Sequence, residues 1–285
     1  MFKKIPRNLL VASLLFLAGP FLPTLLAPAL SAQRPNASAP TPVTTARSNQ
    51  MMVGIEDAQT IDAMMYNVEG IGSGGREELA RQNVKSYMMP IRQVANSNQE
   101  WAYALTSSLE YYKNLSENFK ENYSPDYLMM SLANQGTRPN IEDGLRFLVE
   151  QGTVSANIVP YGSNVIPGAV YSVPKIRVTN FFYLFRETTR NRNRIFEIKK
   201  ALSRGNPVLV ELRTPPGFER HATATYQPAG AATETHYLNV VGYNSLDETV
   251  ELRGNFGRLW ADAGYVTMSY DDFSAIAVQG FVLHP

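Results

Sequence analysis

The sequence reads NSNQEWAYALTSSLEYY from residue 96 to residue 112. Asn96-Ser97-Asn98 is typical of a helix start, because short polar side chains cap the free N–H groups of the first turn. Apolar side chains then recur at three- and four-residue spacing: Trp101, Leu105, Leu109 and Tyr112. This spacing predicts a helix that buries one face along its length.

Outward from this helix, the apolar spacing changes along the chain. Two further helical stripes end at Gly152 and Gly205: Ile141, Leu145 and Leu148, and then Ile195, Ile198 and Leu202. Short β-rich segments follow at 207–212, 236–243, 249–253, 265–269 and 281–284. Residues 51–89 show only weak helical spacing. Helices before strands predict an α+β fold with two lobes around a cleft.

Composition excludes several classes of function. The 285 residues contain 44% hydrophobic and 18% charged residues, which is globular, and a net charge of +1 gives no support for nucleic-acid binding. The absence of cysteine excludes disulfides, thiolate catalysis and iron–sulfur clusters. With no cysteine and only three scattered histidines, we expect no structural metal and no cofactor.

The first 32 residues are typical of a secretory signal peptide. Positive side chains precede a long uncharged stretch that ends in Ala29-Leu30-Ser31-Ala32, a set of small residues suited to cleavage. An uncleaved membrane anchor is the alternative, but Pro20, Pro23 and Pro28 would break such a helix. We therefore expect export to the periplasm, cell surface or medium, and no membrane contact after removal of the signal. Residues 33–50, rich in Pro, Ser, Thr and Ala, predict a flexible linker.

Several short motifs resemble, in the right order, those of the papain family of cysteine peptidases. They are Glu100-Trp101-Ala102-Tyr103, Ser124 to Leu128, Gly144 to Gly152 with Val159-Pro160-Tyr161, Pro207 to Val210, His236 to Tyr243, Gly254 to Gly257 with Trp260 and Gly264-Tyr265, and Tyr270 to Phe273. The resemblance covers residues 86–285. It implies a papain-like α+β fold over 90–285, with a helical lobe at about 90–190 and an antiparallel β lobe at about 191–285. Residues 51–89 would then be a pro-segment or an N-terminal extension.

The resemblance places Glu100 where the family has its nucleophilic cysteine, and places His236 at the catalytic histidine. A carboxylate at a helix N-terminus is favoured by the helix dipole. Glu100 either forms a buried ion pair with His236 or is a solvated residue of the first turn. Either way, no thiol is present to act as nucleophile.

The other roles of the family match less well. The ungapped match puts Gly254 at the position of the histidine-orienting asparagine, so Asn255 could take that role only across a bulge. It puts Val94 at the oxyanion glutamine, with Gln93 beside it and Gln99 further along. Trp101 and Trp260 are candidates for cleft or scaffold residues.

Three functions follow as hypotheses. The first is an exported, non-catalytic papain-like protein that binds a peptide or protein. The second is a hydrolase of changed chemistry that uses Glu100 and His236 as an acid/base pair. The third is a structural domain whose cleft is filled by aromatic side chains such as Tyr103 or Tyr237.

Overall fold

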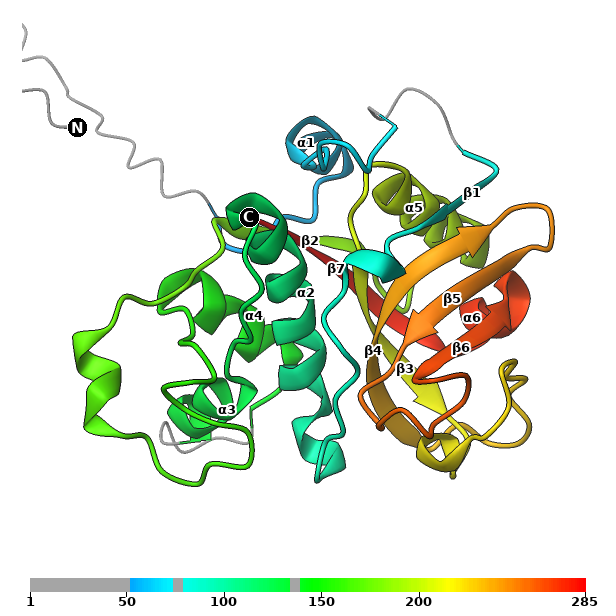
Figure 1. The fold of residues 1–285 in the computed structure, drawn as a ribbon. Helices are drawn as coiled ribbons and strands as arrows, with labels where there is room; N and C mark the ends of the chain where they lie inside the picture. Colours follow the sequence, from blue (N-terminus) through cyan, green and yellow to red (C-terminus); the bar gives the residue numbers. More distant parts are fainter. Residues whose placement is uncertain (1–51, 74–78, 134–138) are drawn as a thin grey trace, which may run out of the picture. The chain divides into compact units, whose positions relative to one another are not determined.

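A computed structural model describes residues 52–73, 79–133 and 139–285, all within the compact unit Gln50–Pro285. The predicted signal peptide (1–32) and linker (33–50) lie outside the described residues. Helices and one antiparallel sheet make up this unit, which confirms the predicted α+β class with a helical and a β lobe (Figure 1). Among the described residues, no helix is both long enough and apolar enough to cross a bilayer.

The helical lobe is built around α2 (Glu100–Glu117), which packs against α3 (Pro125–Ala133) and α4 (Ile141–Glu150). Every residue from Glu100 to Tyr112 is buried, because α2 lies between the other two helices and the sheet (Figure 1). The predicted apolar face is therefore confirmed, but the opposite face is buried as well. Asn140 starts α4 with a capping box that its side chain forms with Asp143.

The sheet forms the second lobe, and all its paired strands run antiparallel in the order β2-β7-β3-β4-β5-β6. The strands are β2 (Asn180–Phe185), β3 (Val208–Thr214), β4 (Glu234–Asn244), β5 (Thr249–Arg253), β6 (Tyr265–Ser269) and β7 (Ala277–His284). Five of them match the predicted strand segments. Strand β2 was not predicted, because its sequence NFFYLF is buried on both faces and lacks alternation.

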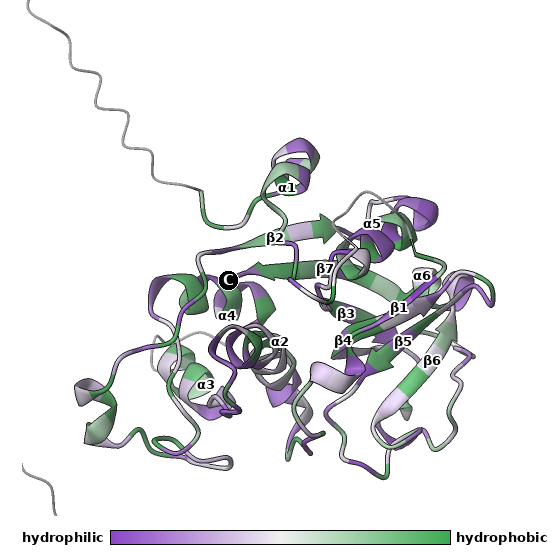
Figure 2. Cartoon of the chain, turned by 45° about the horizontal axis from the view of Figure 1, so that its top comes forward, coloured by the Kyte–Doolittle hydropathy of each residue, from purple (hydrophilic) through white to green (hydrophobic). Residues whose placement is uncertain are grey.

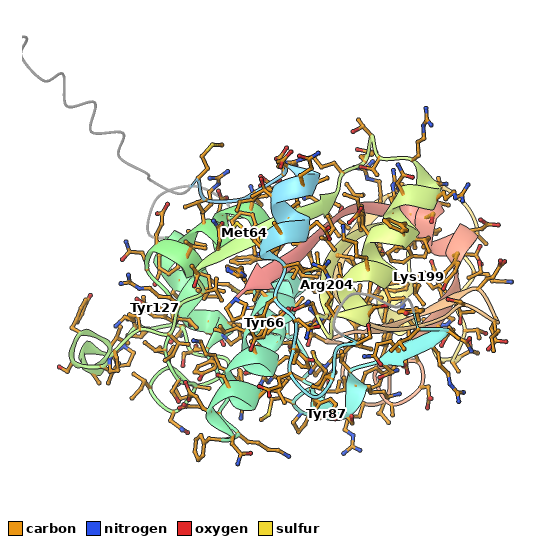
Figure 3. All side chains as sticks on the ribbon, turned by 90° about the horizontal axis from the view of Figure 1, so that it is seen from above. Met64, Tyr66, Tyr87, Tyr127, Lys199 and Arg204 are labelled. Atoms are coloured by element: carbon orange, nitrogen blue, oxygen red, sulfur yellow. The ribbon has the colours of Figure 1, made fainter. Side chains whose placement is uncertain are left out.

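Residues from the segment 51–89 also pack on the β lobe. They form α1 (Ala58–Met64) and β1 (Arg81–Asn83), and β1 pairs with the end of β4 that lies beyond β3. Arg204, at the end of α5 (Asn191–Ser203), donates to Asp62 in α1 at 2.7 Å, and its carbonyl accepts from Val68 N–H. Figure 3 shows Arg204 beside this segment. This part of the chain thus belongs to the folded unit.

Short elements complete the structure: α6 (Tyr270–Ile276) and the 3₁₀ helices Lys85–Tyr87, Ser97–Gln99, Gly168–Ser172 and Phe218–Arg220. Figure 2 shows hydrophobic colours along the strands and hydrophilic colours on the outer side of α5, as expected for a core between helices and sheet. The two lobes are joined by buried polar contacts. Asn239 of β4 donates to Ala104 O at 3.1 Å and to Ser108 Oγ at 2.8 Å, which fixes β4 against α2.

Candidate functional site

Glu100 and His236 meet where the first turn of α2 faces the start of β4. The Nδ1 atom of His236 lies 2.9 Å from Oε2 and 3.2 Å from Oε1 of Glu100. The backbone N–H of Tyr237 donates to the same Oε2 at 3.3 Å. Glu100 is 1% exposed and His236 is 3% exposed. The geometry is therefore that of a buried pair, one of the two arrangements that the sequence left open.

Electrostatics and aromatic packing hold the imidazole of His236 in place. Burial lowers the pKa of His236, but the hydrogen bond and charge of Glu100, together with the charges of Glu234 and Glu219, outweigh it and raise this pKa above its ordinary value. The rings of Phe218 and Phe256 lie 5.1 and 5.6 Å from the imidazole, centroid to centroid. These contacts restrict rotation of the ring, so Nδ1 stays directed at Glu100.

Replacing Glu100 with glutamine is expected to lower the pKa of His236. The substitution removes the nearest charge that favours the imidazolium and leaves the effect of burial, which opposes it. NMR titration of the His236 ring in EDTA-treated protein measures this change. Glu211→Gln is the matched control and should leave that pKa as in wild type. An equal pKa in Glu100→Gln and wild type would contradict the pairing.

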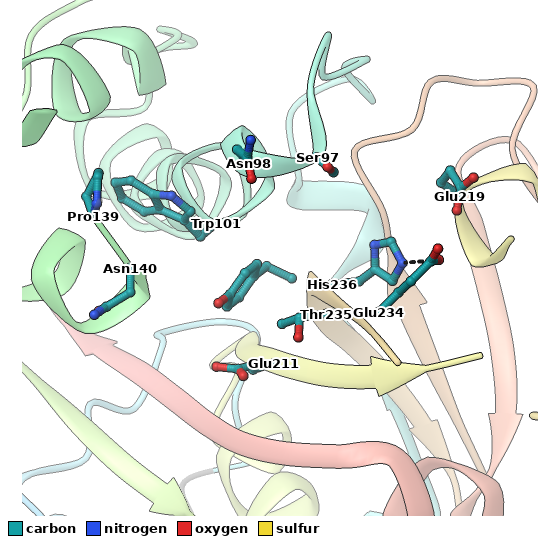
Figure 4. Close-up of a pocket in the computed structure, with 11 residues that line it drawn as sticks. Ser97, Asn98, Trp101, Pro139, Asn140, Glu211, Glu219, Glu234, Thr235 and His236 are labelled. Carbon is teal, nitrogen blue, oxygen red and sulfur yellow. Dashed lines mark ion pairs between the residues drawn. The ribbon is translucent and has the colours of Figure 1, made fainter. Parts of the chain in front are cut away.

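A pocket of about 740 Å³ opens beside the pair, between the start of α2 and the strands β3 and β4. Figure 4 shows Trp101 and Asn98 on its helical side, with Glu211, Thr235 and His236 opposite. Its lining residues are Ser97, Asn98, Trp101, Pro139, Asn140, Glu211, Glu219, Glu234, Thr235, His236 and Tyr237. Among the described residues that line it, three are glutamates and none is lysine or arginine. The pocket therefore favours ligands that carry positive charge.

The predicted site residues with amide side chains lie outside the pocket lining. The side-chain oxygen of Asn255 accepts from Arg253 Nη1 at 3.1 Å, so this buried amide is directed at Arg253. Gln93 is exposed and bridges to Phe256 through its backbone, while Gln99 is the half-buried residue that precedes α2. Neither glutamine lines the pocket.

The two tryptophans have different surroundings. Trp101 lines the pocket and also packs on α4, where a Cβ on Gly144 would come within 2.3 Å of its ring. Trp260 is buried behind the site: its Nε1 donates to Phe218 O at 2.8 Å and its ring packs on Phe256. Trp101 is thus both a pocket and a scaffold residue, and Trp260 supports the aromatic ring contacts of His236.

Sequence reasoning missed the acidic residues of the pocket. Glu234 could have been found, because it stands two residues before His236 on one strand and so shares its face. Its Oε2 lies 3.7 Å from His236 Nε2. Glu211 faces Tyr237 across the β3–β4 pair, a register that the sequence does not give. Glu219 comes from the short 3₁₀ helix Phe218–Arg220 between these strands, which is too short for its residue spacing to carry a signal.

The chain was compared with known proteins. No family model matches the sequence. A relative from Dictyostelium discoideum, gamete and mating-type specific protein A, is 23% identical over 213 residues. The match covers 69% of this chain and 44% of that protein, so the chain spans less than half of that relative's length.

Solved structures show a clearer likeness. A Carica candamarcensis cysteine protease superposes with a TM-score of 0.60 at 13% identity, over 72% of this chain and 98% of that one. Digestive procathepsin L 3 of Tenebrio molitor gives 0.62 at 14% identity, over 79% and 77%. Xylellain, a cysteine protease from Xylella fastidiosa, gives 0.58 at 15% identity, over 81% and 95%. The fold is papain-like, which confirms the predicted architecture.

This fold comes with a sequence that contains no cysteine. The chain therefore combines a papain-like fold with a sequence that offers no thiol. The buried pair of Glu100 and His236 stands at the junction of its two lobes.

Proposed function

We propose that this chain is an exported, non-catalytic papain-like protein that binds a peptide or protein segment in the pocket beside Glu100 and His236. In this proposal Glu100 takes the position of the family's nucleophilic cysteine. The observation that carries it is the 2.9 Å contact between Glu100 and His236 at the edge of an open pocket. The carboxylate pairs with the imidazole in place of a thiolate, and a carboxylate at this position is a poor acyl acceptor.

The surroundings of the pair support the loss of peptidase chemistry. Acyl transfer by this family requires an activated nucleophile and a donor for the oxyanion. Asn255 is directed at Arg253, and the candidate glutamines Gln93 and Gln99 lie outside the pocket lining. Of the groups that the resemblance assigns to catalysis, the proposal retains only His236 beside the pocket.

The pocket supports a ligand with basic side chains. Its volume of about 740 Å³ falls within the range of small-ligand sites. Tyr103 is buried and packs on Tyr161, with 6.0 Å between ring centroids, and Tyr237 lines the pocket without filling its volume. This favours binding over the filled-cleft alternative. Glu211, Glu219 and Glu234 on the wall would attract lysine or arginine side chains of a peptide.

The proposal predicts the outcome of a fluorogenic peptide library. Wild type should release fluorophore no faster than the uncatalysed background, and Glu100→Cys should exceed that background by about 100-fold, because His236 is placed to act as a base for a thiol. If both proteins are silent but fold normally, the groove or the oxyanion site has been lost as well, and a structural or surface-binding role away from the cleft is favoured. Hydrolysis by wild type that Glu100→Ala abolishes would overturn the non-catalytic proposal and favour the acid/base hydrolase.

Binding itself can be followed separately. Trp260→Phe leaves Trp101 as the sole tryptophan, and Trp101 lines the pocket. Titration with Lys- and Arg-containing peptides should change its emission, while acidic peptides of the same length should not. Export is tested by sequencing the N-terminus of the protein recovered outside the cytoplasm, which should begin near residue 33.

A further inference from the structure

The free nitrogen of His236 points at two carboxylates. The side chain of His236 is only 4% exposed, and its Nε2 atom has no hydrogen-bond partner among the described residues. Glu234 Oε2 lies 3.7 Å away (dashed line in Figure 4), and Glu219 completes the group. One ligand atom from each of the three residues lies within 4.8 Å of the other two. An unpaired imidazole nitrogen next to two carboxylates is an arrangement that a cation would complete.

The separations suit a small metal ion. Nitrogen and oxygen ligands bind zinc at about 2.0–2.2 Å, which places neighbouring ligands of a tetrahedral ion about 3.4 Å apart. The 3.7 Å between Nε2 and Glu234 Oε2 is close to this spacing. The side chains of Glu219 and Glu234 are 37% and 40% exposed, so they can move inward while His236 is held by its packing.

The opposite nitrogen of the ring is also arranged as metal sites require. A histidine that binds a metal commonly donates its other N–H to a carboxylate, which sets the tautomer and the ring orientation. Here Glu100 accepts from Nδ1 at 2.9 Å, so the lone pair of a neutral ring lies on Nε2, toward Glu219 and Glu234. Glu100, which in the proposed function occupies the position of the nucleophile, thereby orients His236 so that its Nε2 can bind a metal ion.

We propose that Glu219, Glu234 and His236 bind one divalent transition-metal ion, with Glu100 as a positioning residue. A nitrogen with two carboxylates suits Zn²⁺ or Mn²⁺ better than Ca²⁺ or Mg²⁺, which prefer oxygen ligands alone. The negative potential of the two carboxylates attracts a metal ion as well as a proton. A bound ion would therefore displace any proton on Nε2. All three residues line the pocket, so any open coordination position would face it. This inference does not depend on peptide binding.

The test uses the full chain, freed of metal with EDTA and dialysed. Calorimetric titration with ZnCl₂, and separately with MnCl₂, should show one saturable site per chain for at least one ion. Glu219→Gln and Glu234→Gln should each weaken binding by about tenfold or more, and Glu100→Gln by about 10- to 100-fold. Glu211→Gln removes a charge from the same pocket outside the cluster and should leave the affinity within about threefold.

A second measurement avoids variants altogether. Zinc added to wild type should shift the ring resonances of His236 with one-to-one stoichiometry and leave those of His284 in place. Absence of saturable binding by either ion would overturn the proposal. So would equal affinity in Glu219→Gln, Glu234→Gln and wild type, or an unshifted His236 spectrum at saturating zinc. Since peptide binding is read from Trp101 fluorescence in EDTA-treated protein, the two proposals can fail independently.

Discussion

Replacing Glu110 with alanine is expected to lower the free energy of unfolding by about 3–5 kcal/mol, because it leaves a buried cation without its partner. Glu110 is fully buried on α2, and its Oε1 accepts from Arg92 Nη2 at 2.5 Å and from Tyr123 N–H at 2.7 Å. Arg92 is 11% exposed. Without the carboxylate, this mostly buried guanidinium loses its charge partner and keeps only neutral acceptors such as Asn122 Oδ1 at 2.6 Å. Urea denaturation followed by circular dichroism measures the change.

Two controls separate the lost charge from the lost side chain. Glu117→Ala removes an exposed glutamate from the same helix and should change stability by no more than about 0.5 kcal/mol. The double variant Arg92→Met, Glu110→Leu should lose much less stability than Glu110→Ala. Burial raises the pKa of Glu110 even beside Arg92, so the free-energy cost of removing this carboxylate from water offsets much of its attraction to the guanidinium. A loss in Glu110→Ala no larger than in Glu117→Ala would contradict the expectation.

Replacing His236 with alanine is expected to lower stability by a similar amount, about 3–5 kcal/mol. The carboxylate of Glu100 would stay buried, with the Tyr237 N–H 3.3 Å away but without the imidazole that balances its charge. The substitution also leaves a cavity between Phe218 and Phe256. Urea denaturation of metal-free protein measures the loss.

The control is His221→Ala, which removes a half-buried histidine with hydrogen bonds to Thr223 and the Thr225 carbonyl, and should cost about 1 kcal/mol. Adding Glu100→Gln to His236→Ala should restore part of the lost stability, because the uncompensated charge is then gone. If His236→Ala is as stable as His221→Ala, Glu100 is hydrated in solution, as in the second arrangement that the sequence allowed.

Periodicity and spacing sufficed for most of the fold. The stripes at Trp101, Ile141 and Ile195 each became a helix, and strands β5 and β6 begin and end at the predicted residues. The spacing of apolar residues indicates which face of a helix or strand is buried, so it predicts those elements whose other face is exposed to solvent. It fails for β2, which is buried on both faces, and for residues 52–89, whose short elements depend on partners far along the chain.

The site was predicted less completely. The sequence offered Glu100 and His236 as partners, but only the structure brings them within 2.9 Å. Asn255 was predicted as a candidate to orient His236, and its side chain instead contacts Arg253, whose charge is buried beneath it. The expectation of no metal rested on counts of cysteine and histidine. Those counts take no account of carboxylates. Here Glu219, from a 3₁₀ helix, and Glu234, from β4, lie beside the same imidazole.

The pairing of β1 with β4 has a consequence for proteolytic processing. Asn83 and Arg81 pair with Gly242 and Asn244, the end of the same strand that begins beside His236. A peptidase that removed the chain up to Asn83 would remove strand β1. The backbone N–H and C=O groups at this end of β4 would then be unpaired and free to pair with other chains. Such trimming would favour aggregation over activation. In this molecule, residues 81–83 cover the end of β4 and satisfy backbone groups that would otherwise be exposed there.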